Sequence, residues 1–566
     1  MAVTGGTVDM KTAVGFPFPQ GCTVEGQTAN FSVAVPEGQT CELIIYKKGA
    51  RASAFSQEMP YSDVAGNLHF LSVVLEQPED YEYCYKIGGK IVPDPYGKAF
   101  SGREHWSVSK GKEKRKLRTR IVTDTFDWGK SQFPHLKKED VIAYSLHVRG
   151  FTKHSSSGVA HKGTFDGVTE KLPYLQKLGI NQIHLMPVYE FDENQRHVNY
   201  WGYGKAYFFA PKASYAAGDP VNEMKSLVRQ MHLAGIEVIL EMPFTEGTTF
   251  SLILDCLRYW VMQYHVDGFI VNPYICNPDE LAKDPVLAKS KILKKEDGFQ
   301  NVMRRFLKGD EGVVTDVMYQ TRKRWDLEGI YNCITTHTGF TLKDLVSYDG
   351  KHNEANGENN QDGPDYNYSW NCGAEGLTRK KAVLELRKNQ MRNAMFLLLL
   401  SQGVPCILAG DEFANSQKGN NNVYCQDNPI GWLNWRNLLK EQEMYQFVKQ
   451  LIKFRKKYRL FHQEKELLGI DQSGCGMPDV SYHGEMAWRA STEVASRQIG
   501  IYYSSQDKEE ADCFVAYNMH WLEHEFALPA LKKGRKWYRA ASTKEGILKD
   551  LVVLENQRNI ELDERE

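Results

Sequence analysis

From about residue 140 onward, helix-like segments that stop at glycine alternate with short segments that are apolar along their whole length. In one such unit, Asp219 and Pro220 provide the N-cap and first turn of a helix that Gly235 ends, and the strand-like run Ile236–Met242 follows. The same order recurs at Phe165–Leu178 with Ile180–Met186 and at Lys380–Ser401 with Val404–Leu408. Such strands are covered on both faces, which predicts a parallel sheet between layers of helices. Periodicity does not decide whether that sheet closes into a barrel.

One strand of this series ends in an amide side chain. The segment His265–Asn272 is apolar in its middle and follows the helix-like run Leu252–Tyr264. In a barrel of alternating strands and helices, the reacting groups stand at the C-terminal ends of the strands. Asn272 is therefore predicted to face a substrate pocket.

The regions on either side of this alternation are typical of β-structure. From about Asn30 to Val108, short runs such as Phe31–Val35 and Cys41–Tyr46 are punctuated by proline and glycine, which predicts an immunoglobulin-like β-sandwich. Strand-like runs return after Leu467, at Glu485–Trp488, Gln498–Tyr503 and Asp512–Tyr517. A chain of 566 residues is too long for one core. We expect three domains, at residues 1–125, 126–465 and 466–566.

Charge and cysteine usage narrow the functional classes. The 70 Lys and Arg residues balance 71 Asp and Glu residues, so no overall field favours nucleic acid or a membrane surface, and a neutral substrate is expected. Eleven cysteines, scattered singly, argue against a disulfide framework or a cysteine-rich zinc site. Met1–Phe18 has no secretory pattern, and the apolar run Ala394–Leu400 is too short to span a bilayer. We expect a cytoplasmic protein without a cofactor.

Two local motifs suggest other functions. The basic run Lys110–Arg120 has the charge of a nucleic-acid patch, but no aromatic residue is interleaved in it, which favours a solvated linker between domains. His520-Trp521-Leu522-Glu523-His524 matches an H-x-x-E-H zinc motif. That chemistry requires a helix, whereas this stretch follows a predicted strand, so no metal site is expected.

A long collinear series of motifs resembles a known family. The motifs run in order from about Asp140 to Arg436: His147–Phe151, Leu185–Val188, Asn199–Tyr203, Gly339–Leu342, Asn353–Asn360, Gly410–Phe413 and Gln417–Asn428. They resemble the isoamylase and glycogen-debranching branch of glycoside hydrolase family 13, which cuts α-1,6 branch points. The resemblance implies an α/β fold, a (β/α)8 TIM barrel, flanked by an N-terminal immunoglobulin-like β-sandwich and a C-terminal β-sandwich. Val92–Ala99 is similar to carbohydrate-binding module family 48.

The catalytic positions of that family hold other residues here. Asn272 stands where the family has its aspartate nucleophile, and Ile270 replaces the arginine beside it. Lys295 is the direct match to the acid/base glutamate, although a gap of one residue would substitute Glu296, and Thr338 replaces the third carboxylate. An amide is a poor nucleophile and a hydroxyl cannot supply the negative charge that an oxocarbenium-like centre requires. We expect the site to have lost hydrolysis.

Other groups at the same strand ends keep two alternatives open. In the first motif, Glu241 and Glu246 replace the aspartate and the histidine that the family uses to shape the sugar site. Glu246 and Glu296 are the only plausible replacement carboxylates, and an inverting site could use a wider pair. Aromatic and imidazole groups suited to binding a sugar remain, either as binding residues or as core packing: Tyr203, Trp201, His337 and Phe340.

These observations predict a debranching-enzyme-like protein of starch or glycogen metabolism with an inactive site. In our leading interpretation it binds α-glucan (glycogen, starch or maltooligosaccharides) or regulates glucan metabolism. Its expected partners are a catalytic isoamylase-type subunit or further copies of itself. One alternative is an active α-1,6 hydrolase that uses Glu246 and Glu296. The other is an assembly protein without sugar binding.

Overall fold

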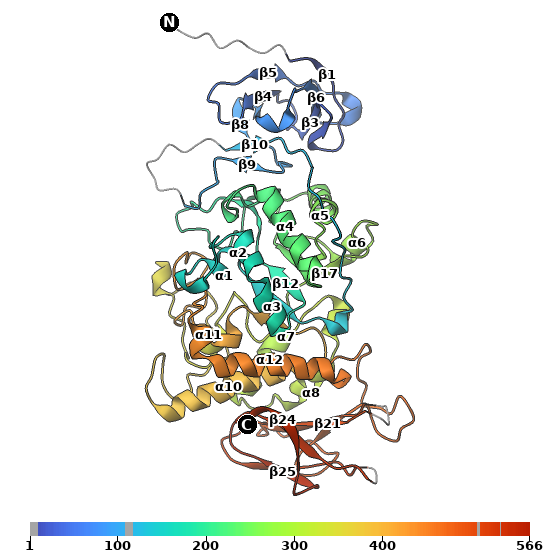
Figure 1. The fold of residues 1–566 in the computed structure, drawn as a ribbon, viewed down its shortest axis with the longest axis vertical. Helices are drawn as coiled ribbons and strands as arrows, with labels where there is room; N and C mark the ends of the chain where they lie inside the picture. Colours follow the sequence, from blue (N-terminus) through green and yellow to red (C-terminus); the bar gives the residue numbers. More distant parts are fainter. Residues whose placement is uncertain (1–9, 108–116, 506–509, 532–533) are drawn as a thin grey trace.

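The computed structural model describes residues 10–107, 117–505, 510–531 and 534–566 (Figure 1). The part of the basic run between residues 110 and 116 and the part of the N-terminus before residue 10 lie outside these ranges. Figure 1 shows a β-rich module at each end of the molecule and the helix-rich region between them. No helix in the described ranges is both long enough and apolar enough to cross a membrane.

The N-terminal module packs two antiparallel sheets face to face around a core that includes Phe31, Leu43 and Tyr83. The first sheet has the order β1-β6-β3-β2 and the second has the order β5-β4-β7-β10-β9, with β8 paired to β7. The strand bounds are β1 Thr12–Val14, β2 Gly21–Glu25, β3 Thr28–Ala34, β4 Cys41–Lys47, β5 Phe55–Glu58, β6 Leu68–Val74, β7 Tyr81–Ile87, β8 Lys90–Val92, β9 Phe100–Ser101 and β10 Arg118–Arg120. The described end of the basic run is therefore strand β10 and not linker. There Arg118 lies 3.5 Å from the centre of the Tyr46 ring.

The central region is built on a six-stranded parallel sheet of order β17-β16-β15-β12-β11-β18. Its strands are β11 Ala143–Leu146, β12 Gln182–Leu185, β15 Glu237–Met242, β16 Gly268–Val271, β17 Lys291–Leu293 and β18 Cys406–Leu408. The two edge strands are linked through residues 330–332 by single parallel bridges, Lys294 with Ile330 and Asn332 with Pro405. Eight strands in a closed ring were predicted. The structure instead has six strands in a parallel sheet and one segment, residues 330–332, that bridges to both edge strands.

The sequence around β17 accounts for part of this difference. Only four residues separate β17 from helix α7 (Gly298–Lys308), and Gly309–Val313 joins α7 directly to α8 (Val314–Arg322). No strand is recorded between these two helices, which the structure describes throughout. One strand of the expected alternation is therefore replaced by a short loop.

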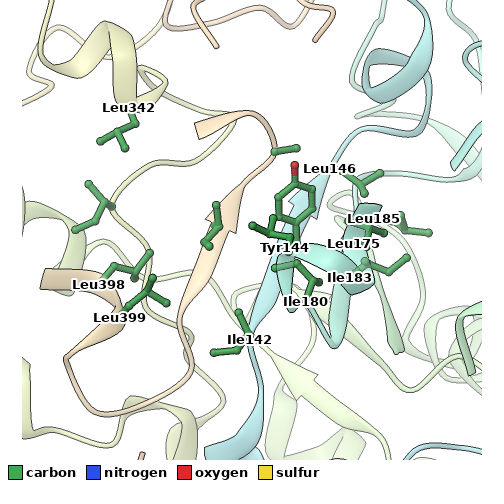
Figure 2. Close-up of a cluster of buried hydrophobic side chains, with 14 of the residues drawn as sticks. Ile142, Tyr144, Leu146, Leu175, Ile180, Ile183, Leu185, Leu342, Leu398 and Leu399 are labelled. Carbon is green, nitrogen blue, oxygen red and sulfur yellow. The ribbon is translucent and has the colours of Figure 1, made fainter. Parts of the chain in front are cut away.

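Helices cover the outer face of the sheet, and a β-hairpin, β13 Tyr189–Phe191 with β14 Ala206–Pro211, follows β12. The remaining helices are α1 Val148–Thr152, α2 Phe165–Glu170, α3 Leu172–Leu178, α4 Pro220–Leu233, α5 Phe250–Tyr264, α6 Pro278–Ala282, α9 Leu342–Leu345, α10 Lys381–Leu399, α11 Asn437–Lys440 and α12 Gln442–Lys457. As predicted, the Asp219 side chain caps α4 by accepting from the Asn222 N–H at 3.0 Å. Figure 2 shows Leu175 of α3 beside Ile183 and Leu185 in the apolar layer under the helices.

Hydrogen bonds between the two asparagine-rich motifs join two loops that are distant in the sequence. The Asn353 amide donates to Asn421 Oδ1 at 2.8 Å, and the Asn421 N–H donates to Asn353 Oδ1 at 3.0 Å. Gln426 Nε2 donates to Asn356 Oδ1 at 2.7 Å. These reciprocal amide bonds satisfy buried polar groups and hold together two segments that are more than sixty residues apart.

The C-terminal module consists of β19 Val480–His483, β20 Gln498–Tyr503 and β21 Cys513–Asn518 in one sheet, and the pairs β22 His524–Ala527 with β25 Asn559–Leu562 and β23 Tyr538–Ser542 with β24 Gly546–Val553. The predicted strand Glu485–Trp488 is instead a turn. Its geometry is fixed where the Trp488 N–H donates to His483 Nδ1 at 2.8 Å. The stretch from His520 to Glu523 is non-helical and leads into β22, as the sequence indicated.

Side chains on the inner face of the central sheet form alternating charged and apolar layers. Ala143, Ile239, Ile270, Tyr331 and Cys406 belong to one buried apolar cluster. Below it, Lys291 Nζ lies 2.5 Å from Glu237 Oε2, which also accepts from Gln182 Nε2 at 2.7 Å. Lys291 is in register with Gly268 of β16, so this lower ion pair spans β16.

Gly268 is required by the close approach of the β17 backbone to β16. A Cβ at this position would lie 2.1 Å from the Lys291 carbonyl oxygen. We predict that Gly268→Ala destabilises the fold by about 1–3 kcal/mol or more, because β17 must move away. Gly350→Ala, where a Cβ meets no atom within 4 Å, is the matched control and should change the free energy of unfolding by less than about 0.5 kcal/mol. Denaturant unfolding of both variants measures this. Equal stability of the two variants would contradict the prediction.

Candidate functional site

At the C-terminal end of the sheet, three other side chains lie around one buried carboxylate. Glu241, near the end of β15, is 5% exposed. Lys295, two residues beyond β17, places Nζ 2.6 Å from Glu241 Oε1. The Tyr203 hydroxyl donates to the same oxygen and lies 2.6 Å from His337 Nε2. We call Glu241, Lys295, Tyr203 and His337 the mouth cluster.

The chain positions each member through its strand or loop. Glu241 is in register with Ile270 of β16, and Ile270 is in register with Leu293 of β17. Lys295 follows Leu293 by two residues in the chain. Successive strand residues point to opposite faces, which puts Glu241 and Lys295 on the same inner face. Ile270, where the resemblance places an arginine, lies between them and contributes no charge.

Hydrogen-bond chemistry fixes the protons within the cluster. An ionised carboxylate only accepts, so the single Tyr203 proton goes to Glu241. The Tyr203 oxygen then accepts from His337, whose Nε2 must carry its proton. The neutral His337 ring is therefore oriented by Tyr203, and its Nδ1 keeps its lone pair.

Burial and neighbouring charges set the ionisation states. Burial by itself raises the pKa of Glu241, but the charge and hydrogen bond of Lys295, with His337 and Tyr203, hold that pKa below its ordinary value. Burial, followed by the charge of Lys295, lowers the pKa of His337 to about 3. Burial and the charge of Glu241 raise the pKa of Tyr203 well above its ordinary value. At neutral pH the cluster holds an ionised Glu241 and a neutral His337.

Asn272 lies at the end of β16 as predicted, but its side chain is used locally. Its Oδ1 accepts from the Tyr274 N–H at 3.0 Å, and its carbonyl accepts from the N–H groups of Ile275 and Cys276 at 3.0 and 3.1 Å. The residue is exposed. Asn272 thus closes a turn after the strand, a role that asparagine side chains commonly have.

Three of the other predicted site residues, Thr338, Glu246 and Glu296, are exposed. Thr338 is exposed and its hydroxyl lies 3.1 Å from that of Thr336. Glu246 and Glu296 are both exposed, and Glu296 lies just before the start of α7. No hydrogen bond or ion pair in the described ranges joins Glu246 to Glu296.

The two remaining predicted sugar-binding aromatics are buried. Trp201 is 6% exposed, and the centre of its ring system lies 5.0 Å from that of His337 in an edge-on contact. The Phe340 side chain is fully buried in the main core, with its ring centre 6.2 Å from that of Tyr348. Tyr203, which is only partly buried, is the aromatic member of the set that retains accessible surface.

Sequence reasoning did not identify the contact between Glu241 and Lys295. A signal for it was present, because Glu237 and Glu241 are four residues apart on one strand and Lys291 and Lys295 have the same spacing two strands away. On strands with a two-residue period, both glutamates share one face and so do both lysines. Matching these spacings would have predicted two stacked ion pairs.

The Lys295–Glu241 pair gives a pH-dependent prediction. Lys295→Met leaves Glu241 buried without its cation, and because the Lys295 side chain is 34% exposed we expect a loss of about 1–3 kcal/mol, below the 3–5 kcal/mol typical of fully buried pairs. In the parent the lowered pKa of Glu241 contributes stability that is lost as pH falls through that pKa. In the variant burial raises the pKa, so stability falls as pH rises above about 4.3.

The difference between parent and variant should therefore widen from about pH 4 to pH 7, as measured by urea unfolding at each pH. Glu241→Gln combined with Lys295→Met removes both charges and should recover most of the loss at pH 7. A difference that does not depend on pH would show that the pair is not coupled as described.

Comparison with known proteins agrees with the fold. Residues 138–246 match the family model described as the alpha amylase catalytic domain. Chloroplastic isoamylase 1 of Arabidopsis thaliana is 31% identical over 92% of this chain and 84% of its own length. The glycogen operon protein GlgX homologue of Haemophilus influenzae is 32% identical over 66% of this chain and 74% of its own.

Solved structures agree with the fold. Pullulanase from Bacillus acidopullulyticus superposes with a TM-score of 0.74 at 17% identity, covering 97% of this chain and 74% of that one. Pullulanase type I from Bacillus subtilis, solved with maltose, gives 0.73 at 18% identity, covering 97% and 85%. The alignment with the Arabidopsis protein spans 674 positions, more than the 566 residues here, so that relative carries segments that this chain lacks. The chain belongs to the isoamylase and glycogen-debranching branch of glycoside hydrolase family 13.

Proposed function

We propose that this protein binds α-glucan, or regulates glucan metabolism, without hydrolysing the glucan. The 2.6 Å contact between Lys295 and Glu241 carries the proposal. Retaining hydrolysis needs two carboxyl groups about 5 Å apart, one to attack and one to protonate the leaving oxygen. At the strand ends, the Glu241 carboxylate is paired with Lys295. The Asn272 side chain is an amide that accepts a hydrogen bond within a turn. Neither group is in a position to act as the attacking carboxylate.

Electrostatics support the same reading. An oxocarbenium-like centre is cationic, and a carboxylate stabilises it only if its charge is not already neutralised. The positively charged Lys295 ammonium group contacts the buried Glu241 carboxylate and neutralises its charge. Thr338, at the family's third carboxylate position, adds no negative charge. The site therefore lacks a net negative field where a glycosyl cation would form.

Groups for binding a sugar remain at the same place. Tyr203 offers a partly exposed ring, and an aromatic face can bury the apolar side of a glucose unit. His337, held neutral by burial, offers its Nδ1 lone pair to a hydroxyl. The maltose-bound pullulanase shows that a relative of the same fold accommodates this class of ligand.

The wider assignment is proposed on the same basis. The protein acts in starch or glycogen metabolism, in the cytoplasm, with a catalytic isoamylase-type subunit or further copies of itself as partners. Its N-terminal module at residues 1–125 resembles a carbohydrate-binding module, followed by a barrel at 126–465 and a C-terminal β-sandwich at 466–566. We propose that residues 330–332, which bridge to both edges of the sheet, stand where a further barrel strand would lie.

Binding to glycogen tests the proposal. We expect the purified chain to co-sediment with glycogen and Tyr203→Ala to weaken this binding about tenfold, because stacking on an aromatic ring contributes roughly 1–2 kcal/mol. Tyr319→Ala, a 43% exposed tyrosine on α8, is the control and should bind like the parent. Equal binding by the two variants would remove Tyr203 from the site. Absence of binding by the parent, with a stable complex recovered from cells, would favour an assembly role.

Restoring two family carboxylates should not restore activity. We predict no debranching of pullulan by Asn272→Asp combined with Thr338→Asp, because Lys295 would still neutralise Glu241 and Ile270 would still supply no charge for a nucleophile. Reducing ends released from pullulan provide the measurement. Turnover by the double variant, absent from the parent, would show that only these two positions block the chemistry.

A further inference from the structure

A second cavity lies at the opposite end of the central sheet from the mouth cluster. Its volume is about 240 Å³, and its polar lining comes from Glu139, Asp140, Asn181, Arg455, Lys456 and His462. Ile142, which also lines it, lies just before the start of β11 in Figure 2, whereas Leu146 ends that strand. Asn181 is level with the residue before Glu237, so this base cavity is about 16 Å below Glu241 along the strands, at 3.3 Å per residue.

Two buried side chains at the base cavity, His462 and Arg455, have nitrogen atoms without a hydrogen-bond partner among the described residues. His462 is 7% exposed, and neither of its ring nitrogens makes a hydrogen bond to a described residue. Its Nδ1 lies 3.4 Å from Asp140 Oδ1, without the geometry of a hydrogen bond. Arg455, 1% exposed, uses its terminal nitrogens on the carbonyls of Leu399, Ser401 and Gly403, while its Nε has no partner in the described ranges. Such groups cost about 1–3 kcal/mol each when left unsatisfied.

The size of the base cavity favours a ligand larger than water. One ordered water needs only about 10–15 Å³ of such space. Pockets that bind drug-sized ligands have volumes of roughly 300–1,000 Å³. A cavity of about 240 Å³ therefore suits a compact molecule.

The charges at the base cavity favour a neutral ligand. The carboxylates of Glu139 and Asp140 balance the cations of Arg455 and Lys456. Burial and the charge of Arg455 lower the pKa of His462 to about 4, so at neutral pH this ring offers one donor and one acceptor. An anion would meet two carboxylates, and a cation would meet Arg455 and Lys456. A ligand whose groups both donate and accept satisfies donors and acceptors together, and neighbouring hydroxyls do this.

We propose that the base cavity is a second ligand site that binds a neutral polyhydroxyl compound of monosaccharide size. The site is separate from the mouth cluster and does not depend on glucan binding there. The bound molecule is either a free sugar or one terminal unit of a glucan chain, since both present the same hydroxyls.

Ligand-observed NMR with D-glucose on the full chain tests this proposal. Tyr203→Ala serves as the background, so that binding at the mouth does not contribute. We expect saturable glucose binding in that background. His462→Phe should weaken it about tenfold, the loss of one or two hydrogen bonds, and Asp140→Ala should also weaken it. Asp365→Ala, a 76% exposed carboxylate that does not line the cavity, is the control and should have no effect.

Two further measurements complete the test. Thermal unfolding without ligand confirms that each variant is folded, and Asp140→Ala, whose side chain is 52% exposed, provides a second variant if His462→Phe does not fold. Repeating the titration with inorganic phosphate and with glycogen distinguishes the ligand classes. Glycogen binding that His462→Phe weakens would identify a chain end, and glucose binding alone would identify a free sugar. Phosphate binding without glucose binding, or no binding of either, would overturn the proposal.

Discussion

Lys295 reaches Glu241 across the strand between them, and Lys291 reaches Glu237 in the same way at the other end of those strands. Both pairs lie on the inner face of the sheet, separated by the apolar layer that contains Ile239 and Ile270. A buried carboxylate is costly unless it is paired. Gly268 lets the β17 backbone approach β16 closely, and the upper pair lies at the C-terminal ends of the strands, where barrels of alternating strands and helices hold their reacting groups. The packing of the interior and the chemistry of the mouth are thus linked by one pattern of charge.

The polar groups at the mouth are stabilised by one another, and the rest of the fold is stabilised separately. Stability comes from the apolar layers on both faces of the strands and from the helices over the outer face, none of which depends on a catalytic carboxylate. The mouth cluster is satisfied internally, with Glu241 accepting from Lys295 and Tyr203. Asn272 closes the turn that carries Tyr274. The result is a stable strand end whose polar groups already have partners.

The sequence predicted those parts whose physics is local. The N-cap at Asp219, the helix that Gly235 ends and the apolar strands were all readable from residue type and spacing. Glu485–Trp488 was predicted as a strand from its apolar content, but a hydrogen bond to His483 made it a turn. The absence of a strand between α7 and α8 was not predicted. The pairing of Lys295 with Glu241 depends on strand order and register, which no local pattern contains. The base cavity could not be predicted from local patterns, because its lining residues are more than three hundred positions apart in the sequence.

Turnover of pullulan and glycogen by the purified parent protein tests the central claim most directly, with released reducing ends as the readout. Our account predicts no release above a blank without protein, because the carboxylate at the mouth is neutralised by Lys295 and no second one contacts it in the described ranges. Steady turnover that Glu246→Gln or Glu296→Gln abolishes would contradict the account and would establish a hydrolase with replacement carboxylates.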